Sequence, residues 1–104
     1  MIFDWKEYSL DDVAELTGGY AFKSNQYKES GVFVLRTLNI DYEGYISMDD
    51  SVFVSNSDAE QFERFELIEK DILFVMVGAT LGKVGRVPKN VLPALLNQNM
   101  WRIR

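Results

Sequence analysis

The sequence contains neither cysteine nor histidine among its 104 residues. Without cysteine the chain forms no disulfide, no thiolate zinc site and no cysteine nucleophile, and without histidine it lacks the commonest general base and metal ligand. Its apolar runs are far shorter than the ~20 residues of a membrane-spanning helix, and residues 1–7 have neither a basic leader nor a long apolar segment. These absences argue against most enzyme classes and predict a soluble cytoplasmic protein that carries no cofactor.

Acidic residues are missing from the C-terminal third of the chain. Residues 1–71 carry six Lys or Arg against sixteen Asp or Glu, whereas residues 72–104 carry five basic residues and no acidic one. The net charge of −5 opposes general binding to nucleic acid, because affinity for phosphates depends on the counterions that lysine and arginine displace. A polyanion is therefore expected to bind the basic end. Five phosphate contacts would limit the slope of log K against log salt to about −4.5.

The length and the hydrophobic content of 47% fit a single domain with a core of its own. The order of the predicted elements indicates an α+β fold, dominated by sheet, with short peripheral helices. A capping box at Ser9 indicates a helix that ends at Gly18–Gly19, and a second capping box at Ser57 indicates a helix over residues 57–65. Strands are expected at residues 32–38, 45–48, 52–54, 72–77, 83–87, 92–96 and 100–103.

The expected strand at residues 72–77 is apolar on both faces. Such a strand lies inside a sheet and is covered on both sides, most simply by the two helices and a second layer of sheet. Residues 83–87 resemble its hairpin partner, and residues 92–96 and 100–103 are expected to add a further pair. The interior strand therefore leads directly into the basic part of the chain.

Residues 78–83, Gly-Ala-Thr-Leu-Gly-Lys, follow that strand and invite comparison with a phosphate-binding loop. A P-loop has four residues between its glycines and a Ser or Thr after the lysine, whereas here three residues intervene and Val84 follows. The pattern is therefore more typical of a hairpin loop whose glycines allow positive φ. Thr80 and Lys83 are then either merely solvated or, together with Arg86, presented to a DNA backbone or groove.

Three amides, Asn97, Gln98 and Asn99, stand in a row between apolar segments. Asn and Gln pair bidentately with adenine in the major groove, but amides are also common in ordinary turns, and both interpretations remain open. Arg36 lies within an expected strand, where it either forms a half-buried ion pair or reads guanine. Aromatic residues flank Lys23 and either pack in the core or stack on bases.

Several segments follow one another in a characteristic order along nearly the whole chain. They are Leu10 to Ala14, Gly19 to Ser24 with Tyr27, Gly31 to Ile40, Lys70 to Phe74, residues 78–83 and Leu96 to Asn99. Together they resemble the target recognition domain of a type I restriction–modification specificity subunit, which implies a fold like that of the DNA methylase specificity domain. The family pattern has glycine where this chain has Lys70. A family subunit continues with a spacer helix and a second recognition domain, so the resemblance implies a single, incomplete recognition domain over residues 1–104.

Subunits of this family bind DNA without making or breaking bonds, and the resemblance implies the same role here. It implies double-stranded DNA as the ligand, a partner methyltransferase subunit that binds S-adenosylmethionine and modifies adenine, and a partner restriction subunit that translocates and cuts. The residues expected to contact phosphates are Lys23, Lys83, Arg86 and Lys89. The residues expected at base edges are Arg36, Thr80, Asn97, Gln98 and Asn99.

A second hypothesis is a truncated protein-interaction module that binds no nucleic acid. Such a module would use its acidic face or an unpaired edge of its sheet. Residues 100–103, which include Trp101, are the expected edge strand, and an unpaired edge invites a second copy to pair with it as a homodimer. Light scattering that shows a monomer at high concentration would contradict this hypothesis.

Overall fold

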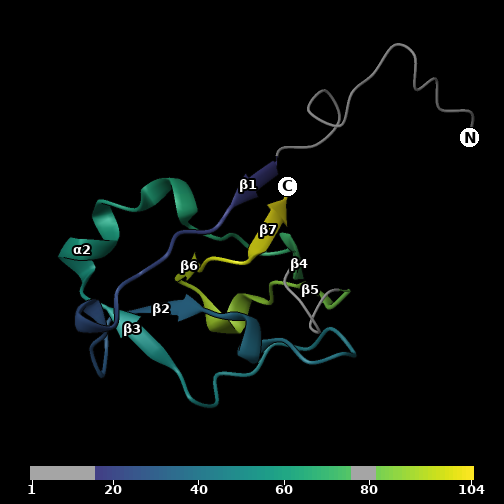
Figure 1. Ribbon diagram of the computed structural model, residues 1–104, viewed down its shortest axis with the longest axis horizontal. Coiled ribbons are helices and arrows are strands. Elements are labelled where there is room, and N and C mark those ends of the chain that lie inside the picture. Colours follow the sequence, from purple (N-terminus) through teal and green to yellow (C-terminus); the bar gives the residue numbers. More distant parts are fainter. Residues whose placement is uncertain (1–15, 76–81) are drawn as a thin grey trace, which may run out of the picture.

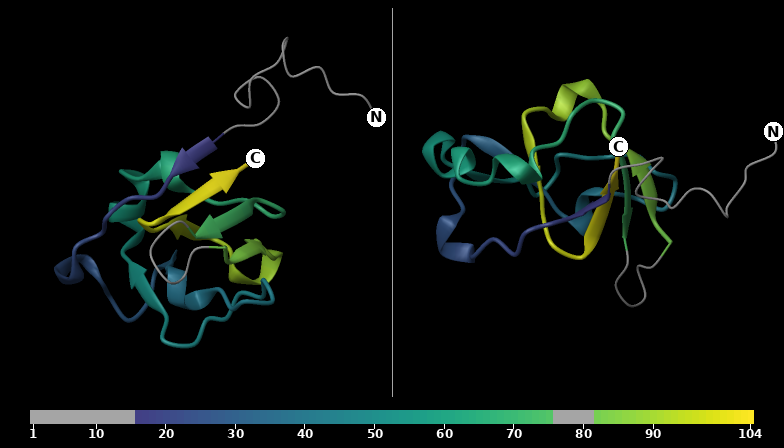
Figure 2. Two further views of the ribbon diagram at one scale, coloured as in Figure 1. Left: turned by 45° about the vertical axis from the view of Figure 1, so that its right-hand side comes forward. Right: turned by 90° about the horizontal axis from the view of Figure 1, so that it is seen from above.

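The structure, a computed structural model, describes residues 16–75 and 82–104. Within these ranges the strands form a four-stranded and a three-stranded sheet (Figures 1 and 2). The four-stranded sheet has the order β1 (Leu16–Gly18), β7 (Met100–Ile103), β4 (Ile72–Val75) and β5 (Val84–Arg86), antiparallel throughout. The three-stranded sheet has the order β3 (Val52–Val54), β2 (Val32–Leu35) and β6 (Ala94–Leu96). The β2–β3 pair is antiparallel and the β2–β6 pair is parallel.

Short helical segments connect the strands. They are α2 (Asn56–Glu60) and the 3-10 helices η1 (Ser24–Gln26), η2 (Thr37–Asn39), η3 (Glu63–Phe65) and η5 (Lys89–Val91). In the described part of the chain, none of the helices has the length and apolar character that crossing a bilayer requires. The arrangement is rich in sheet and poor in helix, which confirms the coarse prediction of a small α+β domain.

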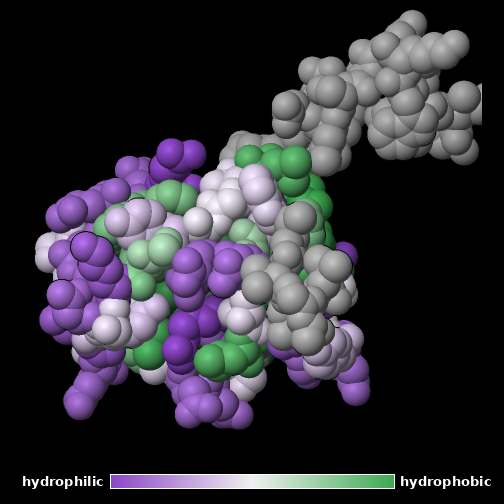
Figure 3. All heavy atoms as spheres, in the orientation of Figure 1, coloured by the Kyte–Doolittle hydropathy of each residue, from purple (hydrophilic) through white to green (hydrophobic). Residues whose placement is uncertain are grey.

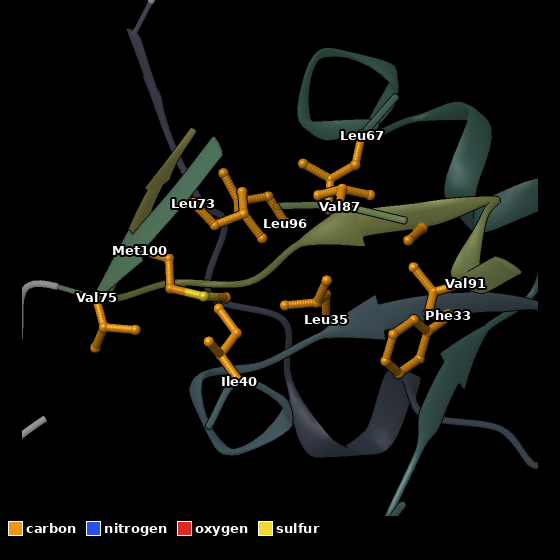
Figure 4. Close-up of a cluster of buried hydrophobic side chains, with 11 residues drawn as sticks. Phe33, Leu35, Ile40, Leu67, Leu73, Val75, Val87, Val91, Leu96 and Met100 are labelled. Carbon is orange, nitrogen blue, oxygen red and sulfur yellow. The ribbon is translucent and has the colours of Figure 1, made fainter. Parts of the chain in front are cut away.

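Side chains from both sheets form the main core (Figure 4). Phe33 and Leu35 from β2 belong to the same buried cluster as Leu73 and Val75 from β4, and each of the four is at most 1% exposed. Full burial of an aliphatic or aromatic side chain contributes about 1.5–3 kcal/mol. The surface in the orientation of Figure 1 carries many hydrophilic side chains, with apolar ones in smaller patches between them (Figure 3). Burial of this cluster is therefore the main force that holds the two sheets together.

Among the described strands, β2 and β6 are covered on both faces, with residues in both core clusters. Val34 points away from the main core, is 0% exposed, and packs with Phe22 and Leu95 in a second cluster. Strand β4 lies between β7 and β5, so the prediction of an interior strand is confirmed. Its outer residues, Ile72 and Phe74, are only half-buried. The prediction that both faces of this strand are covered is therefore wrong for the described residues.

Strand β2 ends at Leu35, three residues before its predicted end. The cause is Asn39, whose Oδ1 accepts a hydrogen bond from the backbone N of Arg36 at 2.8 Å. This contact closes the 3-10 helix η2 and turns the chain out of the sheet. Because an Asn side chain competes with the backbone for hydrogen bonds, β-propensity alone overestimates the length of this strand.

The expected strand at residues 45–48 is absent from the described part of the chain, where an isolated bridge pairs Ile40 with Ile46. The Oδ1 atom of Asp41 accepts hydrogen bonds from the backbone N of Glu43 at 2.9 Å and of Tyr45 at 3.0 Å. These bonds curl the chain into a tight turn, as Asp does in many loops. The turn predicted at residues 41–44 is thus confirmed, at the expense of the strand after it.

The helix predicted over residues 57–65 is not continuous in the structure, where α2 covers Asn56–Glu60 and the separate 3-10 helix η3 covers Glu63–Phe65. Ser55, two residues before the predicted Ser57, caps α2, and its Oγ accepts a hydrogen bond from Asp58 N at 3.1 Å. Both serines are suitable caps, and the choice depends on where β3 ends. The first predicted helix lies largely outside the described residues, and Leu16–Gly18, near its expected end, form β1.

Strands β6 and β7 do not pair with each other, contrary to the expectation from the sequence. Strand β6 pairs with β2, whereas β7 lies between β1 and β4 in the other sheet. The prediction of an unpaired edge at residues 100–103 is therefore wrong, and a homodimer through this strand loses its basis. The edge strands of that sheet are β1 and β5.

Lys70 has a φ of 74°, in the left-handed region. This conformation costs a residue with a side chain about 1–2 kcal/mol, which explains the glycine in the family pattern. We expect Lys70→Gly to raise the free energy of unfolding by about 0.5–1 kcal/mol, since the relief exceeds the added entropy of the unfolded chain. Urea unfolding measures the change. The control Lys89→Gly, at an exposed helical position, should lower stability, and equal effects of the two would contradict the argument.

Candidate nucleic-acid interface

The parallel pairing of β2 with β6 brings Arg36 and Asn97 side by side. Leu35 at the end of β2 is paired with Leu96 at the end of β6, and both strands run in the same direction. The residue after each strand therefore emerges at the same edge. The backbone N of Asn97 donates a hydrogen bond to the carbonyl oxygen of Leu35 at 3.1 Å, which fixes this position.

The register of the other sheet brings Lys83 and the three amides to the same edge. Val75, the last residue of β4, is paired with Met100, the first of β7. The turn Asn97–Asn99 therefore lies beside the end of β4, and Val75 N also donates a hydrogen bond to the carbonyl oxygen of Lys83 at 2.9 Å. Figure 2 (right) shows the turn between β6 and β7 on the same side as the connected ends of β4 and β5. We call Arg36, Lys83 and Asn97–Asn99 the loop edge.

Arg36 is half-buried, and its guanidinium is held on two sides. Its Nη2 donates a hydrogen bond to the carbonyl oxygen of Asp50, and its Cζ lies 6.0 Å from the centroid of the Tyr27 ring. The contact with Asp50 is to the backbone and not to the carboxylate. The Nε atom is buried and has no hydrogen-bond partner among the described residues. Arg36 is therefore a preorganised cation with an unused donor.

The amides at the turn have different surroundings. Asn97 is half-buried, and its Oδ1 atom has no hydrogen-bond partner among the described residues. Gln98 and Asn99 are exposed. Asn99 has a φ of 69°, a conformation that asparagine tolerates better than most residues. Asn99 thus contributes to the conformation of the turn. Gln98 is neither buried nor in the left-handed region, so it is the amide with the fewest structural constraints.

Lys83 is directed into the protein. It is 9% exposed, its Nζ lies 3.3 Å from the carbonyl oxygen of Thr37, and Nζ lies 5.1 Å from the centroid of the Tyr42 ring. Side chains alternate along a strand, and Gly85 is buried like Lys83 whereas Arg86 is exposed. Lys83 and Arg86 therefore lie on opposite faces of the hairpin and do not form one cationic tip.

The remaining predicted contacts lie apart from the loop edge. Arg86 is paired with Ile72 at the end of β5 that is distant from the loop, and Lys89 is exposed in η5. Lys23 is exposed next to η1, where its backbone N donates to Gln26 Oε1 at 2.9 Å. Thr80 lies outside the described residues. The structure thus brings together five of the nine predicted residues and separates three, and their roles stay predictions.

Two of the basic residues in the C-terminal third have structural contacts. Arg102 is 3% exposed and donates hydrogen bonds to the carbonyl oxygen of Glu66 and to Thr17 Oγ1, both at 2.8 Å. Arg104 donates to both carboxylate oxygens of the buried Asp71 at 2.9 Å. Burial alternates along β7, and Arg102 occupies one of its inward positions. This alternation is the sequence signal for the structural role of Arg102. The positive charge free to meet a polyanion is therefore smaller than the sequence suggested.

Two hollows in the described surface lie away from the loop edge. One of about 380 Å³ and another of about 430 Å³ are both lined by Glu63 and Glu66. Residues of the loop edge line neither of them. Carboxylates repel phosphate, so the first hollow is a poor nucleotide site, whereas the second is also lined by Arg64, Arg102 and Arg104. Among the described residues, no group of three or more acidic side chains is placed to hold a metal ion.

The comparisons with known proteins agree with the resemblance noted in the sequence. Residues 3–104 match the model of the family described as type I restriction modification DNA specificity domain. The chain is 29% identical over 103 residues to the type I restriction enzyme EcoAI specificity subunit of Escherichia coli. That alignment covers 96% of this chain but only 17% of the relative, so the chain spans a small part of its length. The chain belongs to the type I restriction modification DNA specificity domain family.

Proposed function

We propose that this chain is a target recognition domain that reads one half of a bipartite DNA sequence. It would do so within a specificity subunit, for partner methyltransferase and endonuclease subunits of the same system, and without catalysing a reaction itself. The observation that supports this best is the loop edge, where strand ends from both sheets place Arg36 beside Asn97–Asn99. Loops on a rigid sheet are the usual carriers of recognition, and Arg and Asn or Gln are the side chains that read guanine and adenine.

The proposed roles follow from exposure. Gln98 and Asn99 are exposed at the loop edge and are the proposed first contacts to base edges. Arg36 and Asn97 carry unused polar atoms behind them, so we propose that they complete the contact when DNA approaches. The ammonium of Lys83 contacts the carbonyl oxygen of Thr37 inside the protein. Lys83 would therefore support the loop edge structurally and add long-range positive potential to it. Thr80 remains a candidate base contact on the sequence pattern.

Phosphate binding by the isolated chain should be weak. With Lys83, Arg102 and Arg104 engaged in contacts of their own, Arg86 and Lys89 remain as exposed cations of the C-terminal third. Two phosphate contacts give a slope of log K against log salt of about −1.8, compared with about −4.5 for five. Partner subunits would supply most of the charge that surrounds the DNA.

Substitution of two exposed residues, Gln98 and Lys89, tests base recognition and phosphate binding separately. We expect Gln98→Ala to relax the preference at one base-pair position by about 1–3 kcal/mol, because a bidentate amide contact is lost. The variant Lys89→Ala should instead weaken binding to all sequences alike and reduce the salt slope by about 0.9. Selection from a randomised duplex library by the chain with its methyltransferase partner, followed by sequencing, measures both. The absence of any sequence preference in the wild type would contradict the proposed function.

A further inference from the structure

The segment from Arg36 to Asp50 closes on itself. The guanidinium of Arg36 donates to the carbonyl oxygen of Asp50, so the two ends are joined. From inside, the Nδ2 atom of Asn39 donates hydrogen bonds to the carbonyl oxygens of Ser47 at 3.0 Å and Asp49 at 3.2 Å. Compact loops with adjacent ends that are packed by their own side chains are frequently functional. We call residues 36–50 the closed loop.

The closed loop carries several exposed large apolar side chains. Among the described residues, seven large hydrophobic side chains are exposed, and four of them belong to this loop. They are Leu38 at 54%, Tyr42 at 72%, Tyr45 at 70% and Met48 at 39%. Ile40, which is 0% exposed, and the half-buried Ile46 anchor the loop in the core. Because Ile40 and Ile46 already anchor the loop, the exposed side chains are not needed for packing, and exposed tyrosine is typical of protein–protein contact surfaces.

The charge of the closed loop identifies the kind of partner. Its sequence contains four acidic residues and one basic residue, Arg36, whose guanidinium is bound within the loop. Glu43, Asp49 and Asp50 are exposed. A duplex would meet repulsion here, because phosphate binding requires cations. A basic protein surface would meet attraction, since complementary charges guide protein association.

The closed loop is rigidly seated against β5. A Cβ atom at Gly44 would lie 2.6 Å from the carbonyl oxygen of Val84, and one at Gly85 would lie 2.8 Å from the carbonyl oxygen of Gly44. Such close backbone approach is possible only for glycine. Tyr42 is also held by the ammonium of Lys83. A preorganised surface loses little entropy on binding, which suits a docking site.

We infer that the closed loop is a protein-docking surface that inserts Tyr42 and Tyr45 into apolar pockets bordered by basic side chains of a partner subunit. Tyrosine is among the residues that dominate interface energies, and the surrounding carboxylates would pair with the basic border. This inference rests on the proposed function, because it takes the methyltransferase subunit of the same system as the partner. The loop edge and the closed loop adjoin at Arg36 and at the contact of Lys83 with Tyr42, so the same domain would present amides to DNA and tyrosines to protein at neighbouring surfaces.

The test measures binding of the methyltransferase subunit to the complete specificity subunit that contains this domain. We expect Tyr42→Ala combined with Tyr45→Ala to weaken this association at least about 30-fold, while Tyr42→Phe combined with Tyr45→Phe retains most of it. The control Ile68→Ala, at a side chain that is 47% exposed outside the loop, should have little effect. Far-ultraviolet circular dichroism shows whether each variant is folded.

Charge reversal distinguishes the two classes of partner. Glu43→Lys combined with Asp49→Lys should weaken binding to the methyltransferase subunit and leave DNA binding unchanged or tighter. If the tyrosine variant instead loses DNA affinity with no loss of protein affinity, the closed loop faces DNA and the inference is wrong. If neither affinity changes, or the wild type does not bind the methyltransferase subunit, the inference is also wrong. The sequence preference of Gln98 variants tests the proposed function separately.

Discussion

Gly19→Ala should destabilise the protein by about 3 kcal/mol or more, because it forces two backbone segments apart. A Cβ atom at Gly19 would lie 1.7 Å from the carbonyl oxygen of Asn97 and 2.3 Å from its carbonyl carbon. Two hydrogen bonds fix the crossing, from Gly19 N to Met100 O at 3.1 Å and from Tyr20 N to Leu96 O at 3.0 Å. Neither segment can move without breaking them, so the loss is steric and cooperative.

The neighbouring glycine is a matched control. A Cβ atom at Gly18 would lie 3.6 Å from the Trp101 side chain, which is ordinary contact. Gly18→Ala should therefore be neutral or raise stability by up to about 1 kcal/mol, since alanine restricts the unfolded chain. Urea unfolding of Gly19→Ala and Gly18→Ala measures the free energy of unfolding of each variant. Similar stabilities would show that the crossing of residues 19 and 97 is not as tight as the structure indicates.

The same crossing links stability to recognition. Gly19 presses on the backbone of Asn97, and Asn97 is tied to Leu35 by its backbone N. The start of the amide turn is therefore held between β1 and β2. A base contact gains precision when its supporting backbone is fixed. A variant at residue 19 that still folds should consequently show reduced sequence discrimination as well as reduced stability.

Local features of the fold were predictable from the sequence. The β4–β5 hairpin follows from an apolar run, a glycine-containing loop and a second β-rich stretch, and its pairing is observed. The turn at residues 41–44 follows from Asp41 and Gly44, and Gly44 N donates to Asp41 O at 3.1 Å. These elements depend on residues close together in the sequence, where turn chemistry and propensity are informative.

The pairing of distant strands was not predictable from the sequence. Strands β2 and β6 are separated by more than half the chain, and only their parallel register places Arg36 beside Asn97. The basic C-terminal third was misread for a similar reason. Arg102 occupies an inward position of β7 and Lys83, just before β5, is also buried, and the side on which a strand is buried depends on the opposing sheet.

Asn39→Ala should cost about 2–4 kcal/mol, because this side chain, which belongs to a residue only 1% exposed, holds the closed loop together. It accepts from Arg36 N and donates to the carbonyl oxygens of Ser47 and Asp49. Alanine leaves three backbone groups without this partner, and each partly buried orphan costs about 1–3 kcal/mol before water reaches it. The free energy of urea unfolding measures the total loss.

Cleavage by chymotrypsin shows whether the loss of stability in Asn39→Ala is located in the closed loop. Tyr42 and Tyr45 are exposed, but a protease needs several residues of extended backbone, which the closed loop does not offer while Asn39 holds it. The variant Asn39→Ala should therefore be cut after these tyrosines much faster than the wild type, under conditions in which both remain folded. The exposed Asn90 provides the control, since Asn90→Ala removes an amide of the same size from a surface position. Equal cleavage of the two variants would mean that the closed loop draws its shape from its contacts with β5, and that Asn39 ends β2 without organising residues 40–50.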